Sequence, residues 1–413
     1  MELVEIAVDD KLDVIFSRFK NAKIYANREI LLPDYVPEEL PHRDNQIIEL
    51  ATVLAPALSG SKPPNVFIYG LTGTGKTAVT KYVLRKLVVK AEGTVLTAYI
   101  NCRQSNTNYR VLAELSSSVG KPVPFTGLST AEVLNRFIRG LERQAKIMIA
   151  VLDEIDWLVK SSGDSVLYHL TRLNSELKRS RLSVIGITND LRFMEYIDPR
   201  IKSGLGEEEL VFPPYTNKEL EDILRKRAEK AFRKGAIEDG VIPLCAAIAA
   251  KQNGDCRLAL DLLLKAADLA EREDSSKVTE EHVRRAQREL EKNLVVAAVK
   301  TMPLHVKLVL LAVYLLEKEG VLKNITTGEI YGRYRDLCRE IGVGEVTQRR
   351  VSEILNELDM LGVINARVVS LGRYGRTKII KLAVGEKSLL EGFRSDPGFY
   401  TMVGSIINSR PSS

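Results

Sequence analysis

The sequence has few of the residues on which redox, zinc and histidine-based chemistry depend. Its 413 residues include only four cysteines and four histidines. The cysteines are widely separated, without a CxxC pair or a nearby histidine at zinc spacing, and no GxSxG or HExxH string occurs. These absences argue against a disulfide framework, a zinc site and a histidine-based hydrolase, so we interpret the cysteines as buried, reduced thiols.

Long apolar runs are also lacking. The longest, Leu308 to Leu316, has nine residues, whereas a membrane-spanning helix needs roughly 20. The N-terminal segment MELVEIAVDDKLDVIF mixes acidic and aliphatic residues and lacks the basic start and apolar stretch of a signal peptide. We therefore expect a cytoplasmic protein without a membrane partner.

What the chain does contain is typical of a soluble globular protein of two or three domains, with 45% hydrophobic and 28% charged residues. Its net charge of +6 is unevenly distributed. Residues 301–384 carry 13 Lys and Arg against 9 Asp and Glu, and residues 347–381 carry seven basic groups against three acids. This basic segment favours a polyanionic partner, although an ordinary solvated surface would have the same composition.

Short aliphatic runs alternate with helical patterns in the first half of the chain. The runs typical of strands are VFIYG, TVLTAYINC, KIMIAVL, LSVIGIT and ELVF. Near-continuous apolar strands separated by helices indicate a parallel sheet covered on both faces. We therefore predict an α/β domain over residues 1–215.

Helical patterns alone follow this domain. The segment TNKELEDILRKRAEKAF begins with a capping box, Thr216 and Glu219, and further helices are expected over 239–252, 255–272 and 279–299. This predicts a helical second domain, residues 216–299. Residues 300–384 then show three helices followed by VINARVVS and RTKIIKLAV, the order of a winged helix-turn-helix. The last stretch, 385–413, has little periodicity, so we expect a frayed tail.

The most specific motif is GLTGTGKT, which fits GxxxxGK[ST] and lies between an expected strand and helix. The glycines of such a loop let main-chain N–H groups converge on phosphates, and the helix N-terminus adds its dipole. Lys76 would reach the β and γ phosphates, and Thr77 would bind Mg²⁺. The motif therefore predicts a site for ATP or ADP with Mg²⁺, whose contacts are Gly70, Gly73, Thr74, Gly75, Lys76, Thr77 and Ala78.

Three polar residues follow neighbouring expected strands. Asp153 and Glu154 come after KIMIAVL, and Asn189 comes after LSVIGIT. Asp153 would complete the Mg²⁺ coordination, and Glu154 is placed to polarise the water that attacks the γ-phosphate. Asn189 ends its strand in the same register, where its amide could hold that water. The alternative for the two acids is a surface pair that only caps a strand.

These motifs occur together with others. GLTGTGKT, VLDEID and ITND are followed by IDPRIKSGLGEEELVFPPYTNKEL, GDCRLALDLL and the C-terminal winged helix. In combination they resemble the archaeal replication initiators of the origin-recognition and helicase-loader type, which are AAA+ ATPases. The resemblance runs from about Tyr35 to about Val384. It implies an AAA+ domain, a helical lid and a winged helix, in a nucleoid-associated ATPase that binds double-stranded origin DNA and hydrolyses ATP slowly, as a switch.

The resemblance also assigns roles to single residues. Asn189 becomes the sensor 1 residue, Arg257 in GDCRLAL the sensor 2 residue of the lid, and Arg200 in DPRIKS an arginine finger that acts on a neighbouring protomer. The alternatives are a structural ion pair for Arg257 and a merely exposed side chain for Arg200. The implied partners are other initiator protomers and the replicative helicase. The expected adenine site consists of Tyr35, Val36, Pro37, Arg43 and Tyr215.

An excursion rich in Gly, Pro and Thr lies between the second and third expected strands. The resemblance implies that it is an initiator-specific insertion that touches the DNA minor groove. An ordinary loop is the alternative. The candidate contacts are Lys121, Pro122, Pro124, Thr126 and Gly127.

In the winged domain, one apolar helical stripe should face the domain core, namely Val351, Ile354, Leu355, Leu358 and Leu361. The opposite face is then free for the major groove, and the tip of the hairpin for the minor groove or phosphates. The alternative is that the winged helix docks a protein. The DNA candidates are Thr347, Gln348, Arg349, Arg350, Arg373, Tyr374 and Arg376.

Two other functional classes fit the same motifs. A ring-forming AAA+ motor or a clamp loader shares the P-loop, the lid and in some cases a winged domain, and it would show DNA-stimulated turnover and stable hexamers. A nucleotide-gated regulator of transcription, or a diverged relative that binds origins without loading a helicase, would have the same sequence features.

Overall fold

The computed structural model describes residues 23–33, 35–124, 126–320, 324–370 and 376–408. The chain forms two compact units, and the boundary between them lies between Arg284 and Arg285. The first unit holds the parallel sheet and the helical lid, and the second holds the winged helix. Each unit is described by itself.

A five-stranded parallel sheet forms the centre of the first unit, as predicted. Its strands lie in the order β2-β3-β4-β1-β5, and every neighbouring pair is parallel. All seven residues of β3 are buried, which explains its uninterrupted apolar sequence. The strands are β1 (Val66–Gly70), β2 (Val95–Asn101), β3 (Ile147–Asp153), β4 (Arg181–Thr188) and β5 (Glu208–Phe212).

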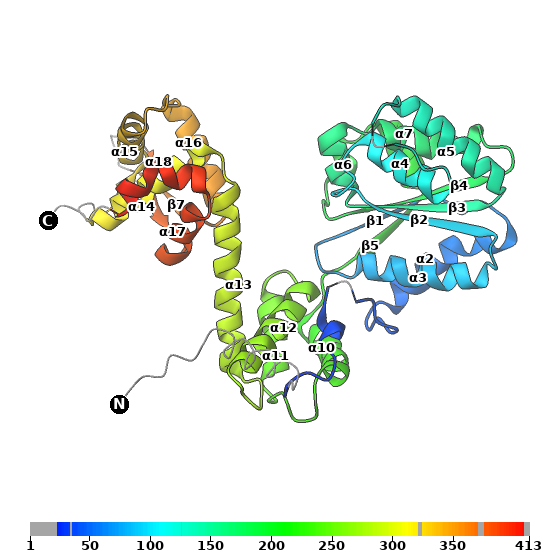
Figure 1. Cartoon of the computed structure of the whole chain (residues 1–413), viewed down its shortest axis with the longest axis horizontal. Coiled ribbons are helices and arrows are strands. Elements are labelled where there is room, and N and C mark those ends of the chain that lie inside the picture. The colour runs from blue at the N-terminus through cyan, green and yellow to red at the C-terminus, as the bar shows by residue number, and fades with distance from the viewer. Residues whose placement is uncertain (1–22, 34, 125, 321–323, 371–375, 409–413) are drawn as a thin grey trace, which may run out of the picture. The chain divides into compact units, whose positions relative to one another are not determined.

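Helices cover both faces of this sheet. On one face lie α2 (Asp44–Leu54) and α3 (Lys76–Lys90), and on the other α4 (Asn108–Ser118), α5 (Thr130–Gln144), α6 (Ile155–Ser162) and α7 (Ser165–Arg172) (Figure 1). The short helices α8 (Phe193–Tyr196) and α9 (Pro199–Leu205) pack into the second of these layers. Successive residues of β1 point to opposite sides: Val66 and Ile68 pack in one core, and Phe67 in the other.

Beyond the sheet, the lid consists of α10 (Asn217–Ala231), α11 (Val241–Lys251), α12 (Cys256–Arg272) and the start of α13 (Glu280–Thr301). Thr216 and Glu219 form the predicted capping box of α10. Between Phe212 and Asn217 only residues 213–216 connect the sheet to these helices, and we call them the lid connection.

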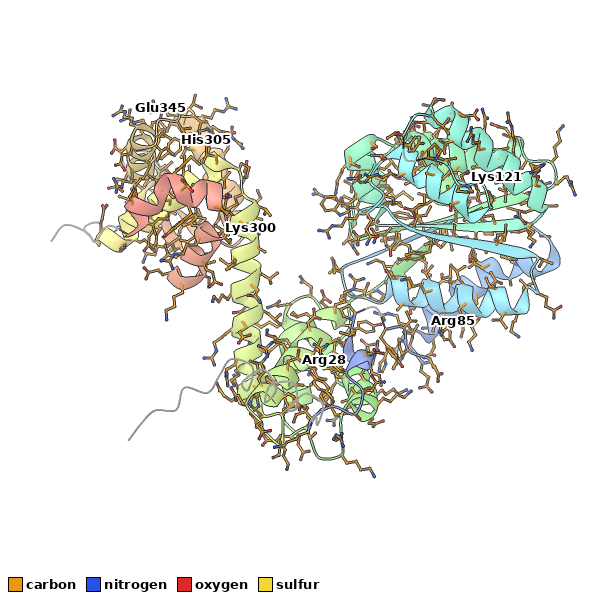
Figure 2. All side chains as sticks on the ribbon, viewed as in Figure 1. Arg28, Arg85, Lys121, Lys300, His305 and Glu345 are labelled. Carbon is orange, nitrogen blue, oxygen red and sulfur yellow. The ribbon has the colours of Figure 1, made fainter. Side chains whose placement is uncertain are left out.

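Residues 23–31, the N-terminal strap, pack against the lid and not against the sheet. The strap ends in the 3-10 helix η1 (Arg28–Leu31), and Figure 2 labels Arg28 on it. The main-chain N–H of Ile24 donates to Glu271, and the hydroxyl of Tyr25 donates to Asp268 over 2.7 Å. The predicted α/β domain, residues 1–215, includes this segment, but its hydrogen bonds are made with lid helices α10 and α12, since the N–H of Ala26 also donates to the carbonyl oxygen of Ala231.

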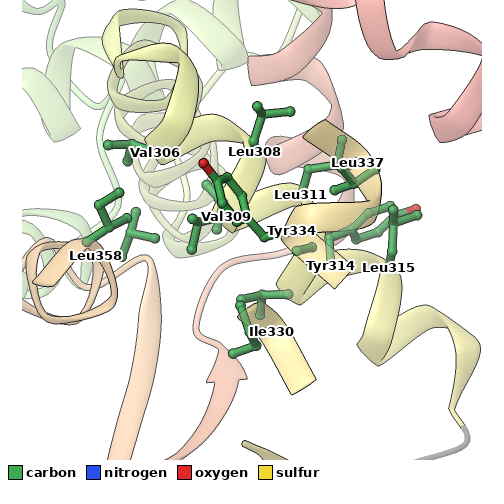
Figure 3. Close-up of a cluster of buried hydrophobic side chains, with 14 of the residues drawn as sticks. Val306, Leu308, Val309, Leu311, Tyr314, Leu315, Ile330, Tyr334, Leu337 and Leu358 are labelled. Atoms are coloured by element: carbon green, nitrogen blue, oxygen red, sulfur yellow. The ribbon is translucent and has the colours of Figure 1, made fainter. Parts of the chain in front are cut away.

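The second unit has the predicted order of three helices and a hairpin. Its elements are α14 (Leu304–Glu319), β6 (Ile325–Thr326), α15 (Thr327–Glu340), α16 (Gln348–Met360), β7 (Ile364–Ser370) and β8 (Arg376–Leu382). Val309, Leu311 and Leu315 of α14 lie beside Ile330, Tyr334 and Leu337 of α15 in one buried cluster (Figure 3). Four of the five stripe residues of α16 are buried, but Leu361 caps the helix and is 62% exposed, so its predicted place in the core is wrong.

The expected frayed tail is also wrong for residues 386–408. They form α17 (Glu386–Arg394) and α18 (Pro397–Asn408), which pack into the core of the second unit. The buried Lys307 of α14 donates to Asp396, between the two helices, and holds that turn against the domain. The periodicity is hard to read in the sequence because each helix is short and Ser395 to Gly398 interrupt it. Their buried apolar residues are Leu389, Phe393, Phe399, Val403 and Ile407.

Among the residues that the structure describes, no helix combines the length and the apolar character that crossing a bilayer requires.

Cysteines 102, 245 and 338 are buried and free, as expected, whereas Cys256 is only half-buried.

The packing of α18 predicts a stability difference between two positions on that helix. Phe399→Ala removes a side chain that is 2% exposed, and it should lower the unfolding free energy of the second unit by about 3–5 kcal/mol. Met402→Ala, at a position 39% exposed, should change it by no more than about 0.5 kcal/mol. Urea titration followed by circular dichroism measures both. The single tryptophan, Trp157, lies in the first unit, so its fluorescence transition serves as an internal control. Equal urea midpoints for the two variants would contradict the packing of α18.

Candidate functional site

A cavity of about 730 Å³ in the first unit joins the P-loop, the carboxyl ends of the central strands and the lid. Its lining includes residues 73–78 of the P-loop, Asp153 and Glu154 after β3, Asn189 after β4, and Arg257 of the lid. The separate motifs of the sequence therefore meet around one space, because parallel strands end at the same edge of their sheet.

The P-loop is held in a conformation that requires glycine. Gly73 and Gly75 have φ values of 72° and 91°, a region that other residues rarely adopt. A Cβ atom on Gly73 would lie 1.7 Å from Oδ1 of Asp255, and one on Gly75 would lie 2.7 Å from the hydroxyl oxygen of Tyr215. In the described part of the chain, no main-chain carbonyl accepts from the N–H groups of residues 73–77. These groups, at the start of α3, are therefore available to an anion.

Lys76 is the buried cation of the loop. Its side chain is 5% exposed, and Nζ donates to the carbonyl oxygens of Gly70 and Leu71, each over 2.8 Å. Burial lowers the pKa of the ammonium group to about 8, and the charge of Asp153 counteracts part of this shift. A polyanion beside Lys76 would favour the charged form.

Oxygen ligands suited to Mg²⁺ lie next to this cation. Oγ1 of Thr77 donates to Oδ2 of Asp153 over 2.7 Å, and the hydroxyl of Tyr99 donates to the same oxygen. Burial and the charge of Asp153 raise the pKa of Tyr99. A hydroxyl and a carboxylate in hydrogen-bond contact fit a magnesium ion that also binds phosphate oxygens. Sequence reasoning missed Tyr99, although its strand pairs with β3 and places it opposite Val151.

Glu154 and Asn189 follow adjacent strands and both line the cavity. Glu154 precedes α6 with φ 55° and ψ 45°, a strained conformation for a residue with a side chain. The two segments are tied together, since Oγ1 of Thr188 donates to Oδ1 of Asp156 over 2.9 Å. The predicted pair of a carboxylate and an amide is thus brought to the same edge as the P-loop.

The other end of the cavity is more apolar and comes from the region around the strap and from the lid. Tyr35, Val36, Pro37 and Tyr215, four of the residues expected at the adenine site, line this end. The guanidinium of Arg227 lies 4.7 Å from the centroid of the Tyr35 ring and donates to the carbonyl oxygens of Ile30 and Tyr35. The lid residues were missed because helix faces carry no short motif. They are Ile223, Lys226, Arg227, Lys230, Cys256 and Leu260.

Three predicted arginines have different surroundings. Arg257, in the first turn of α12, is exposed and lines the cavity. Arg200 does not line it: the side chain, 63% exposed, donates twice to Asp198. Arg43, expected at the adenine site, does not line the cavity either, because its side chain is 2% exposed and lies behind the P-loop.

The residues expected in the initiator-specific insertion lie in the loop between α4 and α5 (Figure 2 labels Lys121). Lys121 is half-buried, and its carbonyl oxygen accepts from Oγ of Ser116. The carbonyl oxygen of Pro124 accepts from the hydroxyl of Tyr109. These bonds fix both sides of the loop, while Pro122, Pro124, Thr126 and Gly127 are exposed.

In the winged helix, the start of α16 is exposed as expected. Thr347 caps the helix through its Oγ1, and Gln348 and Arg349 reach solvent. Nη1 of Arg350 contacts Glu353 and Glu357 at 3.2 and 2.9 Å, so a new partner of Arg350 would have to replace these carboxylates. Arg373 and Tyr374 lie outside the described residues, as does the side chain of Arg376, whose backbone pairs with Ser370.

The lowered pKa of Lys76 predicts how nucleotide binding responds to pH. Below about pH 8 the amine is charged and can pair with phosphate, and above it the free loop loses that charge. The affinity for ATP should therefore fall as pH rises from 7.5 to 9, by up to about tenfold per unit above the pKa. Calorimetry at several pH values measures this. Lys76→Arg, which stays charged, should give a flatter profile, and an equally flat profile in the parent protein would contradict the lowered pKa of Lys76.

Comparisons with known proteins cover all three parts of the chain. The family described as AAA ATPase domain matches residues 39–185, the Cdc6 AAA+ ATPase-type lid domain matches 221–288, and the CDC6 C-terminal winged helix domain matches 297–392. Among solved structures, the Aeropyrum pernix ORC1 protein in complex with DNA superimposes with a TM-score of 0.81 and 49% identity, over 93% of this chain and 99% of that one.

The chain is also similar to curated proteins over nearly its whole length. The chain is 54% identical to ORC1-type DNA replication protein 1 of Sulfurisphaera tokodaii, over 92% of this chain and 95% of that protein. It is 51% identical to the ORC1-type DNA replication protein of Pyrococcus abyssi, over 93% of this chain and 94% of that protein. The chain therefore belongs to the family of ORC1-type DNA replication proteins, with an AAA+ ATPase domain, a lid and a C-terminal winged helix.

Proposed function

We propose that this chain is an ATP-regulated replication initiator that binds double-stranded origin DNA and helps to recruit the replicative helicase. Its likeness over 93% of its length to an ORC1 protein solved with DNA gives the strongest support. The cavity between the P-loop and the lid supports control by a nucleotide.

ATP or ADP would lie in this cavity with its phosphates at the N–H groups of residues 73–77 and its base between Tyr35 and Leu260. Lys76 would exchange its carbonyl partners for the β and γ phosphate oxygens. Thr77 and Asp153 would hold Mg²⁺, which supplies positive charge against the phosphates.

Hydrolysis depends in this proposal on residues at the sheet edge and on the lid. Glu154 would accept a proton from the attacking water, and Asn189 would orient that water. Arg257 would reach the γ-phosphate from the lid, so that loss of this phosphate changes how the lid is held. Arg200 would complete the site of a neighbouring protomer, a role that its exposed position permits. A site that needs a second protomer would hydrolyse ATP slowly when alone.

DNA binding would use two surfaces, one in each unit. The exposed start of α16, with Gln348 and Arg349, would enter the major groove, while the hairpin tip with Arg373 and Arg376 would contact the minor groove or phosphates. In the AAA+ domain, the insertion with Lys121, Pro122, Pro124, Thr126 and Gly127 would touch the DNA minor groove.

The first prediction from this proposal separates nucleotide binding from hydrolysis. Glu154→Gln should bind ATP with nearly the parent affinity, because the amide keeps the shape of the side chain, but it cannot take a proton and should hydrolyse ATP at least about 100-fold more slowly. A filter-binding assay and a phosphate-release assay measure the two effects. Parent-like phosphate release by Glu154→Gln would move the water-activating role to another residue.

The second prediction separates phosphate contacts from base contacts. Arg349→Ala should lower the slope of log affinity against log salt by about one, on specific and random duplex alike. Gln348→Ala should cost about 1–3 kcal/mol on origin DNA and little on random duplex. Fluorescence anisotropy over a salt series measures both variants.

The matched control for these variants is Arg225→Ala, which removes an exposed, ion-paired arginine from lid helix α10. It should leave DNA affinity unchanged at every salt concentration. If Arg349→Ala and Gln348→Ala also bind like the parent, the winged helix does not bind DNA, and the insertion around Lys121 to Gly127 becomes the main DNA site.

A further inference from the structure

Arg43 lies at a joint between the P-loop and the lid connection, residues 213–216. Its Nε donates to the carbonyl oxygen of Thr74 over 2.9 Å, and its Nη2 donates to the carbonyl oxygen of Pro213 over 2.7 Å. A third bond runs from Nη1 to the carbonyl oxygen of His42. All three acceptors belong to the main chain. One planar, buried guanidinium thus ties the phosphate loop to the segment on which the lid pivots.

Tyr215 carries this link into the lid. Its ring centroid lies 3.6 Å from Cζ of Arg43, and its N–H donates to the carbonyl oxygen of Gly254, in the turn between α11 and α12, over 3.4 Å. A Cβ atom on Gly254 would lie 2.3 Å from the carbonyl oxygen of Tyr215. The ring of Tyr215 thus packs on Arg43 while its main chain contacts the lid, so a displacement on either side would be passed to the other.

The peptide groups of the P-loop connect this joint to the phosphate site. A peptide group is planar and trans, so its N–H and its C=O point in opposite directions on one rigid plate. The plate that joins Thr74 to Gly75 has its C=O held by Arg43, and the plate that joins Gly73 to Thr74 has its C=O held by the N–H of Cys256 over 3.2 Å. A phosphate that binds the N–H groups of Thr74 and Gly75 would therefore shift the same peptide groups whose carbonyl oxygens accept from Cys256 of the lid and from Arg43.

We infer that Arg43 is a positioning residue that transmits phosphate binding at the P-loop to the lid connection. The inference rests on the proposed binding of ATP and adds a route to the lid that does not pass through Arg257. Lysine could not replace it, because a single ammonium group cannot reach carbonyl oxygens on the P-loop, on the lid connection and on His42 with the geometry of a planar fork.

Hydrogen exchange followed by mass spectrometry tests this, on the full-length chain with and without saturating non-hydrolysable ATP. In the parent, ATP should slow exchange both in residues 73–78 and in residues 215–220. In Arg43→Met, which keeps the apolar stem, residues 73–78 should remain protected, while protection of residues 215–220 should fall by about tenfold. ATP affinity should change by less than about tenfold, and Arg43→Lys should restore only part of the lid protection.

The matched control is Arg181→Met. Nη1 of Arg181 also donates to two main-chain carbonyl oxygens, those of Leu177 and Ser180, but this residue begins β4, at the opposite edge of the sheet from the P-loop, and does not touch the lid connection. Its exchange pattern with ATP should match that of the parent in residues 73–78 and 215–220.

Parent-like protection of residues 215–220 in ATP-bound Arg43→Met would overturn the inference. Loss of ATP binding by Arg43→Met would also overturn it, because Arg43 would then act on the nucleotide itself. If Arg43→Met does not fold, Tyr215→Leu tests the joint from the lid side. Because Tyr215 also lines the cavity, the variant is compared at saturating nucleotide, with residues 73–78 as the readout of bound ATP; protection of residues 215–220 should fall while that of residues 73–78 remains, and parent-like protection of residues 215–220 would again overturn the inference. Failure of the parent protein to bind ATP would instead contradict the proposed function.

Discussion

The contact between Gly73 of the P-loop and the first turn of α12 is the constraint on which the nucleotide cavity depends. Asp255 caps α12 and lies so close to Gly73 that no side chain fits there, while the N–H of Cys256 donates to the carbonyl oxygen of Gly73. This contact places Arg257 and the apolar face of the lid over the strand ends. The cavity is therefore a property of the sheet and the lid together, and a nucleotide in it would report on both.

Much of this arrangement could be predicted from the sequence because its parts are local. Buried parallel strands are uninterrupted apolar runs, so the ends of β1, β3 and β4 can be read directly, and residues that follow them must meet at one edge. Lys76, Asp153, Glu154 and Asn189 were identified in this way, and all four line the cavity. The capping box of α10 and the stripe of α16 are equally local, except for Leu361, which lies past the end of its helix.

The features that could not be predicted depend on contacts between distant segments. The strap around Tyr25 is linked to the lid by hydrogen bonds across more than 200 residues of sequence. Arg43 was placed at the adenine site by resemblance, yet its side chain faces the back of the P-loop. Residues 386–408 show little periodicity in the sequence, but Phe393 and Phe399 pack in the core of the second unit. In each case the partner surface, and not the local pattern, decides the structure.

If this family member acts at replication origins, as we propose, its binding sites in the cell should lie there, and mapping them is the decisive measurement. The protein is crosslinked to DNA during growth, the bound fragments are sequenced, and replication start sites are located in the same culture from marker frequency. The proposed function predicts that the strongest binding sites coincide with start sites, and that Gln348→Ala loses them while total protein is unchanged. Strong sites at promoters away from every start site would contradict it and indicate a regulator of transcription.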